Sequence, residues 1–125
     1  MIVLDASALL AFLFREAGHE RVAEAADHAC LSAVNLSEVL GRFARDGHDP
    51  VDVLGRIQET SIEIVPFDSD QAALAAALVP ALRPKGLSLG DRACLALAVS
   101  RGVPALTADR AWADLDIGVE IRVIR

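Results

Sequence analysis

The chain has 125 residues, of which 54% are hydrophobic and 24% are charged, a balance typical of a folded domain and not of a disordered chain. The net charge of −6 does not by itself indicate a nucleic-acid partner, although all but one of the basic residues are arginines, which suit phosphate contacts. No apolar run reaches membrane-spanning length and the N-terminus lacks signal-peptide features, so we expect a single cytoplasmic domain over residues 1–125 with no membrane partner.

The first half of the chain shows two apolar strand segments among four helical segments. Residues 2–4 (Ile-Val-Leu) are fully apolar, as in strands of a parallel sheet with both faces covered. Helical spacing of apolar residues and Gly and Pro stop signals define the helices. In chain order the predicted elements are strand 2–4, helix 6–16, helix 18–27, strand 29–33, a helix through 36–43 that stops at 46–50, and helix 51–60.

The second half continues the alternation of strands and helices. Its predicted elements are strand 62–67, helix 68–82, loop 83–86, helix 89–101, strand 103–108, helix 109–115 and strand 119–124. The Asp-Ser-Asp run at 68–70 indicates a helix cap and not a metal motif. Alternating strands and helices with short connections predict an α/β fold around a mostly parallel sheet. Ligands of such sheets bind beyond the carboxyl ends of the strands, where the strand order reverses.

Two acids are expected at that edge of the sheet. Asp5 ends the first strand and Asp109 follows the fourth. An N-cap role alone does not explain Asp5, because it stands between two apolar runs and an unpaired carboxylate in a core is costly. Asp109 has a ready alternative, since it can cap the short helix that carries Trp112.

Two further acids lie on helices. Asp91 shares a helix face with Cys94 and Leu95, so we expect it to point toward the sheet; the alternative is the acid of a capping box. Glu38 borders an apolar stripe, and its alternative is an exposed pair with Arg42. Carboxylates gathered at one edge need a counter-charge, and the simplest is Mg²⁺ or Mn²⁺, which can activate water and neutralise a phosphodiester.

Four segments of the chain together resemble a PIN domain, and in particular the VapC-type toxins of bacterial toxin–antitoxin pairs. They are IVLDASALLAFL, LSAVNLSEVLGRF, LSLGDRACLALA and LTADRAWADL, in the expected order and over essentially the whole chain. The resemblance implies a three-layer α/β/α sandwich with a central, mostly parallel sheet. It also implies a Mg²⁺- or Mn²⁺-dependent endoribonuclease, in which a metal-activated water hydrolyses RNA to 3′-hydroxyl and 5′-phosphate ends.

The resemblance also implies roles for individual residues and partners. The catalytic, metal-binding acids are Asp5, Glu38, Asp91 and Asp109. Supporting residues are Ser7 and Thr107, and Asn35 through a hydrogen bond. Candidate RNA-binding residues near these segments are Arg15, Arg42, Arg45, Arg92 and Arg110. Asp114 is a possible further acid, and a solvated helix face accounts for it equally well. The implied partners are the RNA substrate, an antitoxin protein that covers the active site, and a second copy in a homodimer.

There are four alternatives to this function. A phosphoacceptor receiver domain needs a second acid after the first strand, and a haloacid-dehalogenase-like phosphatase needs Asp-x-Asp there. Both are disfavoured, because Asp5 is followed by Ala6 and Ser7. Two alternatives within the PIN family stay open. One is a scaffold that binds a partner without catalysis, and the other is a nuclease that is not a toxin.

Overall fold

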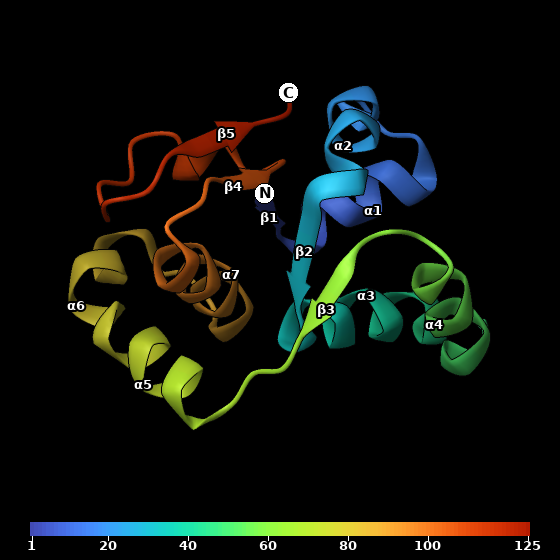
Figure 1. The fold of residues 1–125 in the computed structure, drawn as a ribbon, viewed down its shortest axis with the longest axis horizontal. Coiled ribbons are helices and arrows are strands. Elements are labelled where there is room, and N and C mark those ends of the chain that lie inside the picture. Colours follow the sequence, from blue (N-terminus) through green and yellow to red (C-terminus); the bar gives the residue numbers. More distant parts are fainter.

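The computed structural model describes residues 1–125 and contains one five-stranded sheet with helices on both sides (Figure 1). None of the helices combines the length and the apolar character that crossing a membrane requires. The strands are β1 (Ile2–Leu4), β2 (Ala29–Ser32), β3 (Glu63–Val65), β4 (Ala105–Thr107) and β5 (Ile121–Val123). The helices are α1 (Ala6–Phe14), α2 (His19–Ala25), α3 (Ala33–Arg45), α4 (Pro50–Gln58), α5 (Ser69–Ala77), α6 (Val79–Leu82) and α7 (Leu89–Arg101). Short 3₁₀ turns are η1 (Ala26–His28), η2 (Arg83–Lys85) and η3 (Arg110–Trp112).

The strand order is β3-β2-β1-β4-β5, and every neighbouring pair is parallel. The chain starts in the middle of the sheet, adds β2 and β3 on one side, and then adds β4 and β5 on the other. Leu4 at the end of β1 aligns with Leu31 of β2 and Leu106 of β4. The carboxyl ends of the central strands therefore meet at one edge, and the strand order reverses between β1 and β4, where ligands of such sheets bind.

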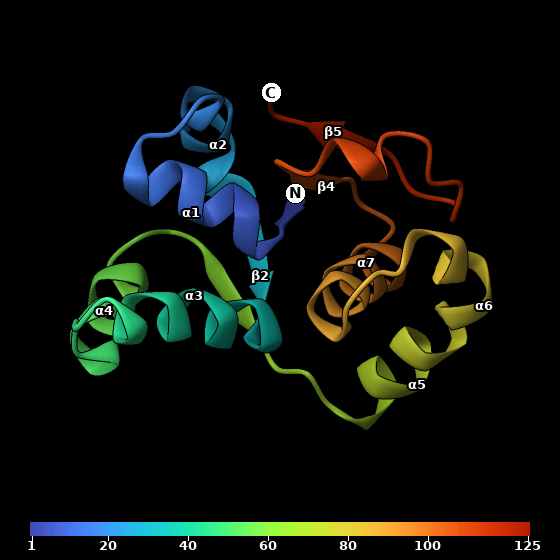
Figure 2. The same ribbon diagram turned by 180° about the vertical axis from the view of Figure 1, so that it is seen from behind.

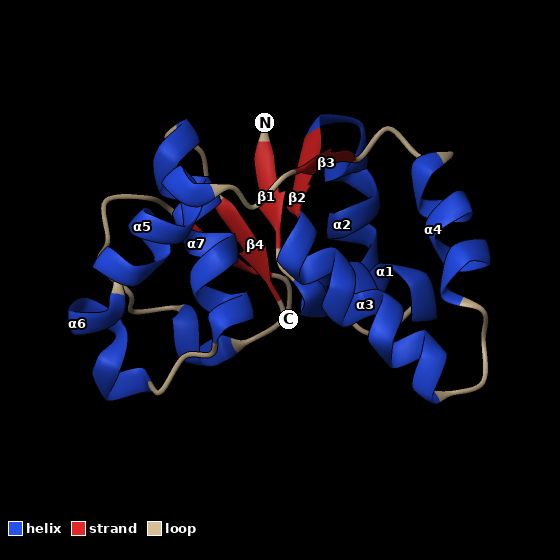
Figure 3. Cartoon of the chain, turned by 90° about the horizontal axis from the view of Figure 1, so that it is seen from below, coloured by secondary structure: helices blue, strands red, loops and turns tan.

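Alternate residues of each central strand enter two separate cores. Ile2 and Leu4 pack into one cluster with α1, α2, α3 and α4, whereas Val3 packs into the other with α6 and α7. Figures 2 and 3 show the same division, with α1–α4 on one side of the strands and α5–α7 on the other. The expected three-layer α/β/α sandwich is confirmed, and its sheet is wholly parallel.

Helix α7 is the most deeply buried helix, because it lies between the sheet and α5. Six consecutive residues, Ala93–Ala98, are buried, so its apolar character extends well beyond the predicted stripe. Its C-terminal end is fixed to β3, since Arg101 donates to both carboxylate oxygens of Glu63 at 2.8 and 2.9 Å. At the N-terminal end of α7, the carbonyl oxygen of Gly90 accepts a hydrogen bond from Asn35 of α3 at 2.9 Å.

Two predicted helices were wrong in extent. The segment 68–82 is two helices, because α5 ends at Ala77 and α6 begins at Val79. Pro80 explains the break, since it has no N–H to continue the ladder and its ring disfavours an unbroken helix. The segment 109–115 contains only the single turn η3, and the predicted loop 83–86 contains η2, which ends at Gly86 with φ +62°. The other boundaries shift by a few residues.

Candidate active site

Asp5 directly follows β1 and is only 4% exposed. Its Oδ1 accepts hydrogen bonds from Ser7 Oγ at 2.7 Å and from the Ala8 amide at 2.8 Å. Its Oδ2 accepts one from Thr107 Oγ1 at 2.6 Å. Asp5 is therefore the N-cap of α1, a role that accounts for Oδ1 alone. The second oxygen faces the end of the neighbouring strand β4.

The two hydroxyls that donate to Asp5 also join β4 to α1. Ser7 Oγ accepts from the amide of Ala108 at 2.9 Å, and Thr107 Oγ1 accepts from the amide of Asp109 at 3.0 Å. The hydroxyl oxygens themselves are 3.3 Å apart. Because each hydroxyl accepts from a backbone amide while it donates to Asp5, both have a fixed orientation. The contacts expected for Ser7 and Thr107 are present.

Asp5 has hydrogen-bond donors but no counter-charge. Burial raises the pKa of Asp5 from its ordinary value of 3.8 to about 6, although the hydrogen bonds from Thr107, Ala8 and Ser7 act in the opposite direction. The nearby carboxylate of Asp91 raises that pKa further. Hydroxyl and amide donors thus offset only part of the cost of the buried charge, which leaves the site suited to a cation.

Glu38 reaches from α3 toward the start of α7. Its Oε1 accepts from Asn35 Nδ2 at 3.0 Å, and the same amide nitrogen donates to the carbonyl oxygen of Gly90 at 2.9 Å. Asn35 is 1% exposed, so its bond to Gly90 is shielded from water, whereas the side chain of Glu38 is exposed. The alternative pair with Arg42 is wrong, because Arg42 instead binds Asp46 at 3.4 Å.

Asp91 is in the first turn of α7 and forms a capping box with Ser88. Asp91 Oδ2 accepts from the Ser88 amide at 3.0 Å, and Ser88 Oγ accepts from the Asp91 amide at 3.3 Å. The capping alternative is confirmed. It does not exclude the other role, because Asp91 is only partly exposed and its charge acts on Asp5.

The charges of the three acids all act on one buried group, the thiol of Cys94. Burial raises the pKa of Cys94 well above its ordinary value, and the carboxylates of Asp5, Asp91 and Glu38 raise it further. None of these three acids takes part in any ion pair of the chain. The charges of Asp5, Glu38 and Asp91 therefore act on one buried group at the sheet edge, and no cation of the chain pairs with any of the three.

Asp109 is the one predicted acid that the structure does not bring to this group. It is exposed, and its Oδ1 accepts from the amide of Ala111 at 2.9 Å, so that it caps η3. Its charge is not among the causes that raise the pKa of Asp5. Its link to the group is indirect, through the hydrogen bond from its own amide to Thr107.

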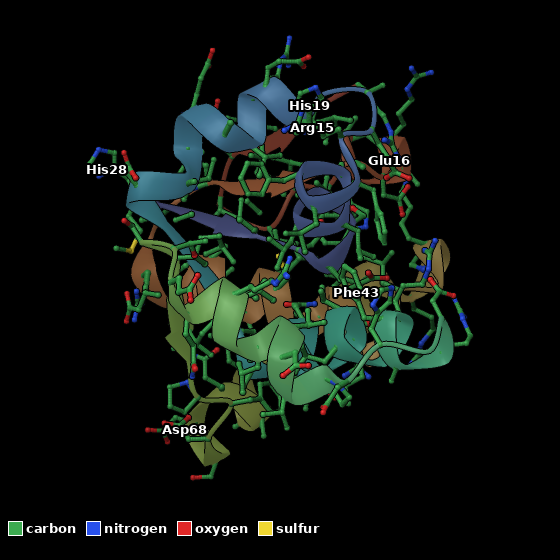
Figure 4. All side chains as sticks on the ribbon, turned by 90° about the vertical axis from the view of Figure 1, so that its right-hand side faces the viewer. Arg15, Glu16, His19, His28, Phe43 and Asp68 are labelled. Carbon is green, nitrogen blue, oxygen red and sulfur yellow. The ribbon has the colours of Figure 1, made fainter.

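Other titratable groups lie outside this group of acids. Asp114 forms an exposed ion pair with Lys85 at 2.7 Å, which accounts for it without a role in the site. Asp68 caps α5 by accepting from Gln71 at 2.9 Å, as expected. Figure 4 shows His19 and His28 at separate places and Asp68 at the far end of the molecule from both.

The donor set fits a hard divalent cation by its chemistry. Asp5, Glu38 and Asp91 offer only carboxylate oxygens, the ligands that Mg²⁺ and Mn²⁺ favour. In the present arrangement no three acidic, histidine or cysteine side chains lie close enough together to hold one ion. One oxygen of Glu38 accepts from Asn35, and one oxygen of Asp91 accepts from Ser88.

Of the five candidate RNA-binding arginines, three are engaged within the chain. Arg92 donates to a carbonyl of α5, and Arg110 donates to the carbonyl of the last residue. The guanidinium of Arg42 lies 5.3 Å from the centre of an aromatic ring at the end of α1. Arg45 and Arg15 form no ion pair, and Arg15 lies at the C-terminal end of α1 (Figure 4).

Sequence reasoning missed Gly90, which precedes Asp91 in α7. A Cβ atom at this position would collide with the carboxyl group of Glu38. The only signal in the sequence is a glycine inside a predicted helix, where it is an unfavourable residue.

Several solved structures share this fold. A toxin–antitoxin complex from Klebsiella pneumoniae is 20% identical with a TM-score of 0.74, and the match covers 95% of each chain. VapC20 of Mycobacterium tuberculosis, described as a sarcin-ricin loop cleaving toxin, is 19% identical with a TM-score of 0.75, covering 96% of this chain and 99% of that one. FitAcB from Neisseria gonorrhoeae is 25% identical with a TM-score of 0.67, covering 96% of each chain.

Among curated protein sequences, none matches this chain. A family model described as PIN domain matches residues 2–118, which include all four segments that carry the resemblance. The α/β/α fold and the position of Asp5, where the strand order reverses, agree with this match. The chain belongs to the PIN domain family.

Proposed function

We propose that this protein is a divalent-metal-dependent endoribonuclease and the toxin of a toxin–antitoxin pair. The observation that carries the proposal is the buried carboxylate of Asp5, which has three hydrogen-bond donors but no cation. Asp91 and Glu38 are two further carboxylates without a paired cation, and their charges act on the same buried thiol, Cys94, as the charge of Asp5 does. A cluster of this kind needs a positive ligand, and a divalent ion supplies it.

Asp5, Glu38 and Asp91 are the residues that we expect to hold Mg²⁺ or Mn²⁺. Ser7 and Thr107 fix both oxygens of Asp5 in place. A divalent ion bound there would lower the pKa of a water molecule and neutralise charge on a phosphodiester. We expect 3′-hydroxyl and 5′-phosphate products.

Asp109 has a different place in this proposal. Because it is exposed and caps η3, we assign it to a second ion or to the substrate-bound state. Its side chain is free to leave the cap at a modest cost, since capping bonds contribute on the order of 1 kcal/mol.

The structural neighbours support the partners in this proposal. The Klebsiella pneumoniae structure is a toxin–antitoxin complex, which favours an antitoxin partner, and the description of VapC20 as a loop-cleaving toxin favours an RNA substrate. The homodimer, the single domain over residues 1–125 and the RNA-binding arginines stay predictions.

The test is cleavage of total bacterial RNA by purified protein free of any co-purified partner. Reactions contain Mg²⁺, Mn²⁺ or EDTA, and Asp5→Asn is compared with the wild type. Asp114→Asn is the matched control, because Asp114 loses its charge in the same way but pairs with Lys85 outside the site.

We expect discrete cleavage that requires the metal, persists in Asp114→Asn and is absent in Asp5→Asn. Equal cleavage by the wild type and Asp5→Asn would show that the activity comes from a contaminant or from another site. Metal binding without cleavage would favour an enzyme with a narrow substrate range or an inhibited complex, whereas the absence of metal binding would favour the non-catalytic scaffold.

A further inference from the structure

Gly90 is the second residue of α7, and it is buried. A Cβ atom built on it would lie 2.5 Å from Cδ and 2.6 Å from Oε2 of Glu38, and it would also collide with Oε1. The carboxyl group of Glu38 thus occupies the space that any side chain at position 90 would need. Glu38 belongs to α3, so this contact joins two helices at the candidate site.

Backbone conformation does not explain the glycine. Gly90 is not among the residues with positive φ, and alanine is favoured over glycine inside a helix. Gly55 of α4 shows the contrast, because a Cβ atom added there meets nothing within 4 Å. What distinguishes position 90 is the carboxyl group lying against it.

Asn35 holds Glu38 in this place. Its Nδ2 donates to Glu38 Oε1 and to the Gly90 carbonyl oxygen, at 3.0 and 2.9 Å. Both partners are acceptors, so the amide can satisfy them only with its nitrogen facing them. The other end of the amide, Oδ1, is buried without a partner. This orientation leaves a polar atom unsatisfied, which indicates that the contact with Glu38 and Gly90 dominates.

We propose that Gly90 is a positioning residue, whose missing side chain lets Glu38 reach from α3 onto the start of α7, where Asn35 fixes it beside Asp91. The inference rests on the proposed function and adds a residue that carries no chemistry of its own. Gly90 acts through Glu38, because the three atoms nearest to a Cβ at position 90 all belong to that carboxyl group.

The test compares Gly90→Ala with Gly55→Ala by calorimetric titration of Mn²⁺ and by RNA cleavage. Because the displaced group is the end of an exposed, flexible side chain, we expect Gly90→Ala to fold. Its Mn²⁺ affinity should fall about 10- to 100-fold, the usual effect of losing the support of a metal ligand, and cleavage should fall with it. Gly55→Ala should bind Mn²⁺ like the wild type.

A double mutant separates positioning from a general effect on the helix. In the Glu38→Ala background, adding Gly90→Ala should cause no further loss of Mn²⁺ affinity. The wild type, Gly90→Ala, Glu38→Ala and the double variant are also melted in EDTA. Gly90→Ala should raise the melting temperature more in the Glu38→Ala background than in the wild type, because the colliding carboxyl group is then absent. This second readout needs no metal.

Three results bear on the proposal in distinct ways. Wild-type Mn²⁺ affinity and cleavage in Gly90→Ala would overturn the role of Gly90 and leave the proposed function intact. Independent, additive losses from Gly90→Ala and Glu38→Ala would show that Gly90 does not act through Glu38. A wild-type protein that neither binds Mn²⁺ nor cleaves RNA would overturn the proposed function, and with it this inference.

Discussion

Replacing Asp5 by Asn removes the buried charge and keeps the shape of the side chain. The amide oxygen can still accept from Ser7 and Ala8, as Oδ1 does now. The amide nitrogen then faces Thr107, whose hydroxyl can accept from it and direct its own proton to the Ser7 oxygen 3.3 Å away. We therefore expect Asp5→Asn to fold with its hydrogen bonds satisfied.

The size of the effect follows from the pKa of Asp5, which burial raises from 3.8 to about 6. One pKa unit corresponds to about 1.4 kcal/mol, so the ionised side chain destabilises the metal-free native state by about 3 kcal/mol. Asn resembles the protonated acid in having no charge. In EDTA at neutral pH, Asp5→Asn should therefore be more stable than the wild type by up to about 3 kcal/mol.

The sign of the pH dependence is fixed by which state binds more protons. Between pH 3.8 and about 6, native Asp5 keeps a proton that the unfolded chain has released, so the stability of the wild type falls as the pH rises. The advantage of Asp5→Asn should be full above pH about 6, about half as large near pH 5, and absent below pH 3.8.

Urea unfolding in EDTA measures this difference, near pH 7.5 and near pH 5. Trp112 is the only tryptophan and is fully buried, so its fluorescence reports the loss of the core. A less stable Asp5→Asn protein at the higher pH, or a difference that does not change with pH, would refute the reasoning. The same variant should fail to cleave RNA, so that stability and activity change in opposite directions.

Three further predictions concern the surroundings of Asp5. Thr107→Val removes the donor to Asp5 Oδ2 and should cost about 1.5–3 kcal/mol in urea unfolding near pH 7.5; unchanged stability would contradict the importance of this bond. Mn²⁺ affinity should fall below pH about 6, because the metal and the proton compete for Asp5, and calorimetry that shows equal affinity near pH 5 and pH 7.5 would contradict it. Asp114→Asn should leave both Mn²⁺ affinity and RNA cleavage unchanged, since Asp114 pairs with Lys85, and a loss of either would place Asp114 in the site.

The fold could be predicted where local pattern and tertiary environment agree. The fully apolar run Ile2–Leu4 indicated a strand covered on both faces, and it lies at the centre of the sheet. The prediction was wrong for segment 68–82, where a long run of helix-forming residues masked the effect of Pro80. It was also wrong for 109–115, where the capping acid Asp109 starts a turn that does not continue.

The site could be predicted only in part, because its contacts cross between elements. Asp5 stood out as an acid between apolar runs, and Asp91 as an acid on an inward helix face. The capping box of Asp91 was predicted as an alternative and is present. The sequence could not show that Glu38 lies against Gly90 and not beside Arg42, or that Asn35 bridges α3 and α7. Those facts depend on how closely α3 approaches α7, which no local spacing determines.

A crystal grown or soaked with Mn²⁺ tests most directly whether three carboxylates from β1, α3 and α7 share one cation. The anomalous signal of manganese locates the ion independently of the protein atoms. We predict one strong peak bound by Asp5, Glu38 and Asp91 at about 2.0–2.2 Å, typical of hard-cation–oxygen bonds, with Glu38 still held by Asn35 through its other oxygen. A fully loaded crystal with no peak at these side chains, or with the ion held elsewhere, would contradict it.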